Sequence, residues 1–152
     1  MSTSKHAVHF SSESDDHGTP QDFFDTLNAE FRFGLDVCAA PHNCKVARYF
    51  DKDDNGLQQD WRVFPREAIW CNPPYGDEIV HWCRKAYMTW KLNKETVVML
   101  LPARTDTHWF QTYILPYAEL RFVAGRLKFE GSESGAPFPS VVAIFRSPNQ
   151  WN

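Results

Sequence analysis

The sequence predicts one α/β domain with a mostly parallel central sheet, helices on both faces and an antiparallel C-terminal edge. Apolar segments with the length of strands alternate with segments of helical periodicity, which is the pattern of parallel strands joined by helices. The closing strands, which include residues 120–123 and 141–145, have no helical segment between them, so we expect antiparallel pairing. The composition, with 43% hydrophobic and 23% charged residues in a chain of 152, is that of a globular domain with one core.

The first expected elements follow a polar N-terminal segment. Residues 1–17 are rich in Ser, His and Asp, and we expect a flexible tail there, followed by a single domain at 18–152. Thr19 is expected to cap a helix with Pro20 at its first position, where a missing N–H is tolerated. Phe and Leu side chains at helical spacing extend this helix over residues 20–30.

Two strands are expected before the middle of the chain. Residues 33–38 have the pattern of the first strand, and small residues after it predict a turn. Residues 68–71 form a buried apolar segment that stops at Asn72. Between the two strands, residues 42–60 are polar and irregular, with a further short strand expected at 46–50.

The second half of the chain continues the alternation of helices and strands. Apolar side chains recur every three or four positions over residues 77–92, which predicts a helix with one buried face. The apolar run at 96–101 begins with β-branched residues, as a central parallel strand does. The remaining expected elements are a helix at 106–113 and strands at 120–123, 126–129 and 141–145.

Composition also narrows the classes of protein. The sequence has no apolar run of about 18 residues and no apolar N-terminal stretch, so we expect neither a transmembrane helix nor a signal peptide, and a cytoplasmic location. The spacing of Cys38, His42 and Cys44 matches no common zinc pattern, and we expect no metal. Residues 1–60 hold 5 Lys or Arg against 11 Asp or Glu, whereas residues 61–152 hold 11 against 8. This asymmetry favours a polyanion beside the second half, although chance variation of surface charge is the alternative.

The most specific feature is Asn72-Pro73-Pro74-Tyr75 at the end of a buried strand. The prolines have a fixed φ and no N–H, so they form a rigid loop in which the Asn72 amide oxygen and the Pro73 carbonyl can point outward. Two acceptors beside the flat Tyr75 ring suit the exocyclic amine of a planar heterocycle, whose nitrogen they would make more electron-rich. The alternative is a plain turn, because Asn-Pro and Pro-Pro are common in loops. A plain turn does not require an aromatic residue there, which favours the chemical interpretation.

This motif resembles the catalytic motif of amino-directed methyltransferases that use S-adenosylmethionine. Further segments of the chain follow one another in the same order as in one branch of these methyltransferases. Residues 17–146 therefore resemble the phage-type (Dam-like) DNA N6-adenine methyltransferases. These segments are Thr19-Pro20, Leu35-Asp36-Val37-Cys38-Ala39, Leu101-Pro102 with Trp109-Phe110, Gly125-Arg126-Leu127 with Phe129, and Pro137-Phe138-Pro139-Ser140. The resemblance implies a Rossmann-like methyltransferase fold without a separate target-recognition domain, in a phage or prophage protein of a bacterial host.

The resemblance also implies roles for residues of the motif. Asn72 and Pro73 would bind the adenine amino group, and Tyr75 would stack on a base extruded from the DNA. Pro74 completes the implied catalytic set. The implied binding residues for S-adenosylmethionine are Thr19, Pro20, Asp36, Cys38, Ala39 and Asp54.

The cofactor segment departs from the commoner pattern, because Cys38-Ala39-Ala40 stands where many methyltransferases have a Gly-rich loop. Asp36 would interact with the cationic methionine end of the cofactor. Asp53 or Asp54, of which Asp54 is preferred, would accept hydrogen bonds from the ribose hydroxyls. The alternatives are that the acidic residues form a solvated turn and that Thr19-Pro20 only starts a helix.

The implied partner is DNA with a target adenine, and the implied assembly is a monomer or a homodimer. The candidate DNA-binding residues are Arg104, Thr105, Trp109, Arg126 and Phe138. Arg104 would pair with a phosphate, or with Asp106 if it is only a surface residue. Arg126 would contact DNA or be a charge at a strand edge. Target reading would come from loops such as 43–60, 76–80, 103–110 and 130–137, with GATC as the site that the resemblance suggests.

The sequence also allows two other functions. The same Asn-Pro-Pro-Tyr motif serves amino methyltransferases that act on RNA or on protein glutamine. A non-catalytic nucleic-acid-binding module on a decayed methyltransferase fold is the second alternative. The lack of a Gly-rich loop and the net charge of −3 favour that second alternative, whereas the intact motif from Asn72 to Tyr75 opposes it.

Overall fold

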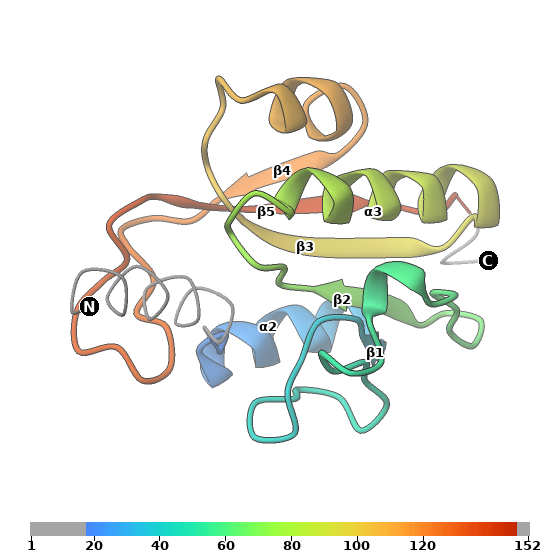
Figure 1. Ribbon diagram of the computed structural model, residues 1–152, viewed down its shortest axis with the longest axis horizontal. Coiled ribbons are helices and arrows are strands. Elements are labelled where there is room, and N and C mark those ends of the chain that lie inside the picture. Colours follow the sequence, from blue (N-terminus) through green and yellow to red (C-terminus); the bar gives the residue numbers. More distant parts are fainter. Residues whose placement is uncertain (1–17, 149–152) are drawn as a thin grey trace.

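The computed structural model describes residues 18–148, and a five-stranded mixed sheet lies at its centre (Figure 1). The elements are α2 (Gln21–Phe31), β1 (Phe33–Asp36), η1 (Gly56–Gln58), β2 (Ala68–Cys71), α3 (Ile79–Asn93), β3 (Thr96–Pro102), η2 (Phe110–Ile114), β4 (Glu119–Phe122) and β5 (Ser140–Phe145). The two long helices and these five strands confirm the expected elements, with small shifts of their ends. The tail expected at residues 1–17 lies outside the described residues.

The strand order is β1-β2-β3-β5-β4. The first three strands are parallel, and β5 is antiparallel to both of its neighbours, β3 and β4. The α/β class and the parallel first strands are therefore confirmed, whereas the C-terminal strand is not itself the edge. β5 lies inside the sheet and β4 forms the edge. Because β1, β2 and β3 run in the same direction, Asp36, Cys71 and Pro102 end their strands on one side of the sheet.

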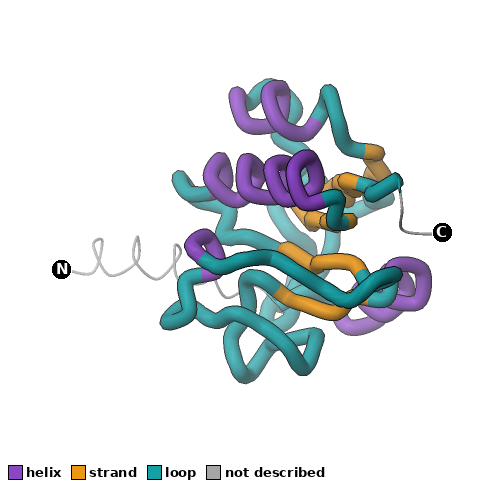
Figure 2. Tube along the Cα trace, turned by 90° about the vertical axis from the view of Figure 1, so that its right-hand side faces the viewer, coloured by secondary structure: helices purple, strands orange, loops and turns teal. Residues whose placement is uncertain are grey.

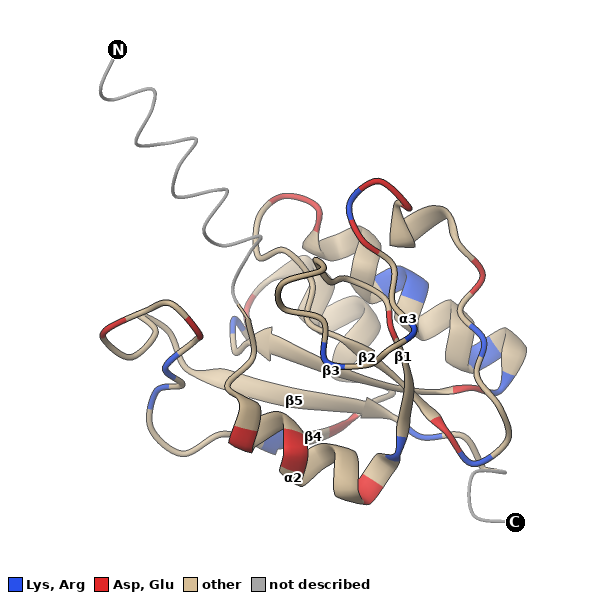
Figure 3. Ribbon diagram, turned by 90° about the horizontal axis from the view of Figure 1, so that it is seen from below, with Lys and Arg blue, Asp and Glu red and all other residues tan. Residues whose placement is uncertain are grey.

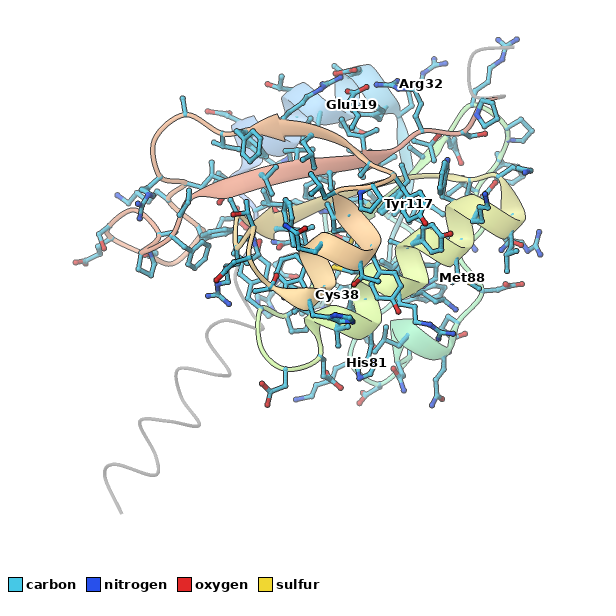
Figure 4. All side chains as sticks on the ribbon, turned by 90° about the horizontal axis from the view of Figure 1, so that it is seen from above. Arg32, Cys38, His81, Met88, Tyr117 and Glu119 are labelled. Carbon is cyan, nitrogen blue, oxygen red and sulfur yellow. The ribbon has the colours of Figure 1, made fainter. Side chains whose placement is uncertain are left out.

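Helices cover both faces of the sheet (Figure 2). On one face, Phe24 of α2 packs edge-on against Trp70 of β2, with ring centroids 5.4 Å apart. On the other face, Trp90 of α3 lies 5.7 Å from the ring of Phe145 in β5. Every residue of β3 is buried between these layers, which explains its unbroken apolar sequence. Tyr117, after η2, packs against the outer side of α3 at Tyr87 (Figure 4).

The start of α2 differs from the expectation. Pro20 is the N-cap, Gln21 is the first helical residue, and no side chain within residues 18–148 caps this helix. The predicted capping role of Thr19 is therefore wrong. Its side chain instead lies in the interior, where only 2% of the residue is exposed, and its hydroxyl accepts a hydrogen bond from Asn72.

Three further expectations need correction. Residues 46–50 run beside β1 but form only an isolated bridge, between Asp36 and Tyr49, instead of a strand. Residues 126–129 are not a strand, because they pair with none of the five strands of the described sheet; they follow a turn at Gly125 (φ 71°), and Ala136 N–H donates back to Leu127 C=O over 2.8 Å. The helix expected at 106–113 begins at residue 108 and becomes the π-helical turn η2, in which Leu115 N–H donates to Phe110 C=O over 2.9 Å.

Within residues 18–148, the structure contains no helix of the length and apolarity that crossing a membrane requires.

Candidate active site

A cavity of about 620 Å³ opens where β1 and β2 end. Its walls come from the segment before α2, the turn after β1, the loop that carries η1, the loop after β2 and the first turn of α3. Its lining residues include Thr19, Asp36, Cys38, Ala39, Lys45, Asp51, Gly56, Asn72, Pro74 and Trp82. The cavity therefore lies beyond the carboxyl ends of parallel strands, which is where ligands of open α/β sheets bind.

The Asn72 side chain is held between two hydroxyl groups. Its Nδ2 donates to Thr19 Oγ1 over 3.1 Å, and its Oδ1 accepts from the Tyr75 hydroxyl over 2.8 Å. The Tyr75 hydroxyl also lies 3.0 Å from the backbone oxygen of Leu100 in β3. The loop after β2 is thus connected to the segment before α2 through the Asn72 carboxamide, and to β3 through the Tyr75 hydroxyl.

The Tyr75 ring points inward. Only 7% of the residue is exposed, and its ring edges meet Phe129 and Phe138 at centroid distances of 6.2 and 5.6 Å. Burial raises the pKa of its hydroxyl well above the ordinary value, so the hydroxyl is neutral and acts as a hydrogen-bond donor. Stacking of this ring on a substrate therefore remains a prediction, and it requires Phe138, which is only half-buried, to make room.

Asp36 is a buried carboxyl group at the cavity wall. It accepts hydrogen bonds from the backbone N–H groups of Cys38 (3.3 Å) and Lys45 (3.4 Å). Loss of hydration outweighs these two bonds and the nearby Lys45 charge, and it raises the pKa of Asp36 to about 7. A cationic ligand in the cavity would stabilise the ionised form of Asp36, because the two charges are opposite.

The acidic loop contributes Asp51 to the cavity. Asp51 and Asp54 exchange hydrogen bonds, each carboxylate accepting from the other residue's N–H over 2.9–3.0 Å. Asp53 and Asp54 are exposed and are not among the lining residues of the cavity, whereas Asp51 is. The other expected cofactor residues divide in the same way: Thr19, Asp36, Cys38 and Ala39 line the cavity and Pro20 does not.

Trp82 is a lining residue that the sequence interpretation missed. Its indole Nε1 is buried and has no hydrogen-bond partner in the described part of the chain. The ring stacks at 28° on Trp61, whose own Nε1 donates to Gly56 C=O over 2.8 Å. A signal was present, since Trp82 follows Ile79 by three positions on the buried face of the helix. Lys45 was also missed, because its loop shows no periodicity.

The candidate DNA-binding residues lie in different settings. Arg104 is exposed, its Nη1 is 3.5 Å from the Tyr75 carbonyl, and its guanidinium lies 5.5 Å from the Phe138 ring centre. Arg104 and Asp106 both lie in the described part of the chain, and they form no ion pair with each other. Thr105 is exposed nearby, whereas Trp109 is buried against Phe110.

Arg126 is exposed on the loop before β5, where its Nη1 donates to Ala136 C=O over 3.4 Å. This loop carries residues of both charge signs (Figure 3). The structure therefore brings Arg104 and Phe138 to the Tyr75 corner, whereas Arg126 contacts Ala136 and Trp109 packs against Phe110.

The fold and the cavity define an α/β domain with a cavity at the ends of its parallel strands, beside a carboxamide held by two hydroxyl groups. The profile of the DNA N-6-adenine-methyltransferase (Dam) family matches residues 7–147. A DNA N-6-adenine-methyltransferase of Haemophilus phage HP1 (strain HP1c1) is 32% identical over 105 residues, which cover 68% of this chain and 58% of the phage protein. The chain belongs to the DNA N-6-adenine-methyltransferase (Dam) family. It spans less than two thirds of the length of this relative.

Proposed function

We propose that this chain is a Rossmann-like methyltransferase that transfers a methyl group from S-adenosylmethionine to N6 of adenine in DNA. The observation that carries the proposal is the position of Asn72, whose carboxamide lines the cavity and is held by Thr19 on one side and Tyr75 on the other. The membership in the Dam family and the similarity to the phage enzyme support the same reaction.

The cavity residues fit S-adenosylmethionine. When bound, this cofactor supplies an electrophilic methyl group on a sulfonium centre. Asp36 would hold its cationic amino-acid end. Asp51 would accept hydrogen bonds from its ribose hydroxyls, the role that the sequence suggested for Asp54, because Asp51 lines the cavity. The buried indole Nε1 of Trp82 offers a donor to an acceptor of the cofactor, such as a purine nitrogen. Cys38 and Ala39 are small enough to let the backbone approach it closely.

The reaction needs an amine whose lone pair points at the methyl group. Asn72 Oδ1 and the Pro73 carbonyl would accept the two amine hydrogens and thereby orient the nitrogen. No formal base is required when the proton leaves after attack, so these residues act mainly by positioning two reactants. Pro73 and Pro74 keep the corner rigid, because neither can change its φ.

The DNA would lie across the corner formed by Tyr75, Phe138 and Arg104. An adenine inside a duplex must be extruded first, and stacking on an aromatic ring offsets part of that free energy. We propose that Arg104 leaves the face of Phe138 to pair with a phosphate, which exposes the ring to the extruded base. Thr105, Trp109 and Arg126 stay weaker candidates, and GATC stays the proposed target.

The proposal is tested by methyl transfer from labelled S-adenosylmethionine, with duplex DNA, single-stranded DNA, RNA and a glutamine-containing peptide offered in parallel. We expect N6-methyladenine in DNA, and a comparison of GATC with a scrambled duplex tests the target. Label in RNA or in the peptide would support the first alternative instead. No transfer together with no binding heat for the cofactor would mean a decayed module.

A further inference from the structure

We infer that Thr19 and Tyr75 are positioning residues, whose two hydroxyl groups fix which end of the Asn72 carboxamide faces the reacting amine. The inference rests on the proposed function and adds a role for both hydroxyls. Asn72 reaches Thr19 with Nδ2 at 3.1 Å and Tyr75 with Oδ1 at 2.8 Å. Thr19 and Tyr75 are 2% and 7% exposed, so water is largely excluded from competing for these bonds.

The orientation matters because a carboxamide is unsymmetrical. Its oxygen accepts two hydrogen bonds and its nitrogen only donates. With the amide turned by half a rotation, Nδ2 would meet the amine hydrogens donor to donor, and the substrate nitrogen would not be oriented. An enzyme that uses Asn at this position therefore needs neighbouring hydrogen-bonding groups that keep the carboxamide oxygen facing the substrate amine.

The two hydroxyls are suited to this task because they differ in acidity. A phenol is a stronger donor and a weaker acceptor than an aliphatic alcohol, so Tyr75 favours the carboxamide oxygen and Thr19 the nitrogen. Burial raises the pKa of Tyr75, which keeps its proton in place as a donor. Since a carboxamide oxygen has two lone pairs, it can accept from Tyr75 and from a substrate amine together.

The location of Thr19 adds a second consequence. Thr19 lines the cavity that we propose binds the cofactor, and its hydroxyl contacts the Asn72 carboxamide that we propose binds the amine. One residue thus contributes to both parts of the site. The Tyr75 hydroxyl also lies 3.0 Å from the Leu100 carbonyl of the central strand, and its single proton is shared between this oxygen and Asn72 Oδ1, which is the shorter contact at 2.8 Å. The Asn72 carboxamide thus contacts one hydroxyl from the segment before α2 and one that also contacts β3.

The test uses Thr19→Val, which keeps the shape of the side chain, Thr19→Ser, which restores the hydroxyl, and Tyr75→Phe, which keeps the ring. Each is made with Asn72 and with Asn72→Asp, whose carboxylate has two equivalent oxygens and needs no orientation. With Asn72 we expect Thr19→Val and Tyr75→Phe to lower the single-turnover rate about five- to tenfold, as loss of one buried hydrogen bond predicts, and Thr19→Ser to restore most of it. With Asn72→Asp the same changes should cost less than about twofold.

A second measurement does not depend on activity. The side-chain NH₂ signals of Asn72, assigned by their loss in Asn72→Asp, should shift in Thr19→Val and return in Thr19→Ser. Unchanged signals in Thr19→Val, equal penalties in both backgrounds, or an effect confined to cofactor affinity would overturn the inference. A wild-type chain that methylates no substrate would refute the proposed function instead, and the NH₂ signals would still decide the orientation.

Discussion

The backbone N–H of Lys45 donates to Asp36 Oδ2 over 3.4 Å, while the Lys45 ammonium bonds Glu130 at 3.0 Å and Gln21 at 3.1 Å. The Lys45 ammonium group thus donates to Glu130 and Gln21, while only the Lys45 backbone N–H donates to Asp36. Asp36 therefore remains a buried carboxyl group with a pKa of about 7, next to a cavity that we propose binds a cation.

This pKa predicts a pH-dependent affinity for S-adenosylmethionine. A cationic ligand favours ionised Asp36, so its affinity should rise between about pH 6 and about pH 8, and binding below about pH 7 should release a proton. For the ligand-free chain the sign is opposite. Its raised pKa means that the folded state holds the proton longer than the unfolded state, so Asp36 makes the free energy of unfolding fall between about pH 4 and about pH 7.

Calorimetric titrations in two buffers of different ionisation enthalpy measure the proton release directly. Asp36→Asn should abolish it, whereas the exposed carboxyl of Asp22, changed to Asn, should not. Equal heats in both buffers at about pH 6.5 for the wild type would contradict the prediction.

Asn72→Ala should abolish methyl transfer while it leaves the affinity for S-adenosylmethionine within a few-fold. The reason is that Asn72 is proposed to bind the substrate amine, while the cofactor is held by other parts of the cavity. The measurement is a labelled-methyl assay beside a calorimetric titration, with Asn93→Ala at the exposed end of α3 as the matched control. Near-normal turnover in Asn72→Ala would refute the acceptor role.

Arg104→Ala should weaken DNA binding and reduce the slope of log affinity against log salt concentration by about 1, because one phosphate contact is lost. Arg84→Ala, on the exposed side of α3, removes the same charge away from the Tyr75 corner and should leave the slope unchanged. Binding of a labelled duplex at several salt concentrations measures both. An unchanged slope for Arg104→Ala would exclude this residue from the phosphate contacts.

Gly56→Ala should lower the melting temperature and the cofactor affinity. A Cβ at this position would lie 2.2 Å from the Val37 carbonyl oxygen and 3.1 Å from the Trp82 ring, so the cavity wall must shift, at about 1–3 kcal/mol. Gly76→Ala is the control for stability, since its Cβ would meet nothing within 4 Å. Thermal unfolding with and without S-adenosylmethionine measures both effects, and an unchanged melting temperature in Gly56→Ala would contradict the close packing.

Local patterns predicted much of this protein. The strand at 68–71 and the helix that begins near Ile79 were predictable because apolar periodicity reflects contacts that each element makes along its own length. The predicted strand at 126–129 failed because β propensity cannot show whether a neighbouring strand is available. Likewise, the acidic loop offered three similar carboxylates, and only its folded turn places Asp51, not Asp54, at the cavity.

The amino-acid sequence by itself determined the order of the elements and the chemistry of the Asn72 corner, since both depend on residue type and on neighbours close along the chain. Only the tertiary structure decided what surrounds that corner. Thr19 and Asn72 are 53 positions apart, and Tyr75 reaches the Leu100 carbonyl across 25 positions. Contacts over such separations depend on how the strands pair and pack, which no local pattern records.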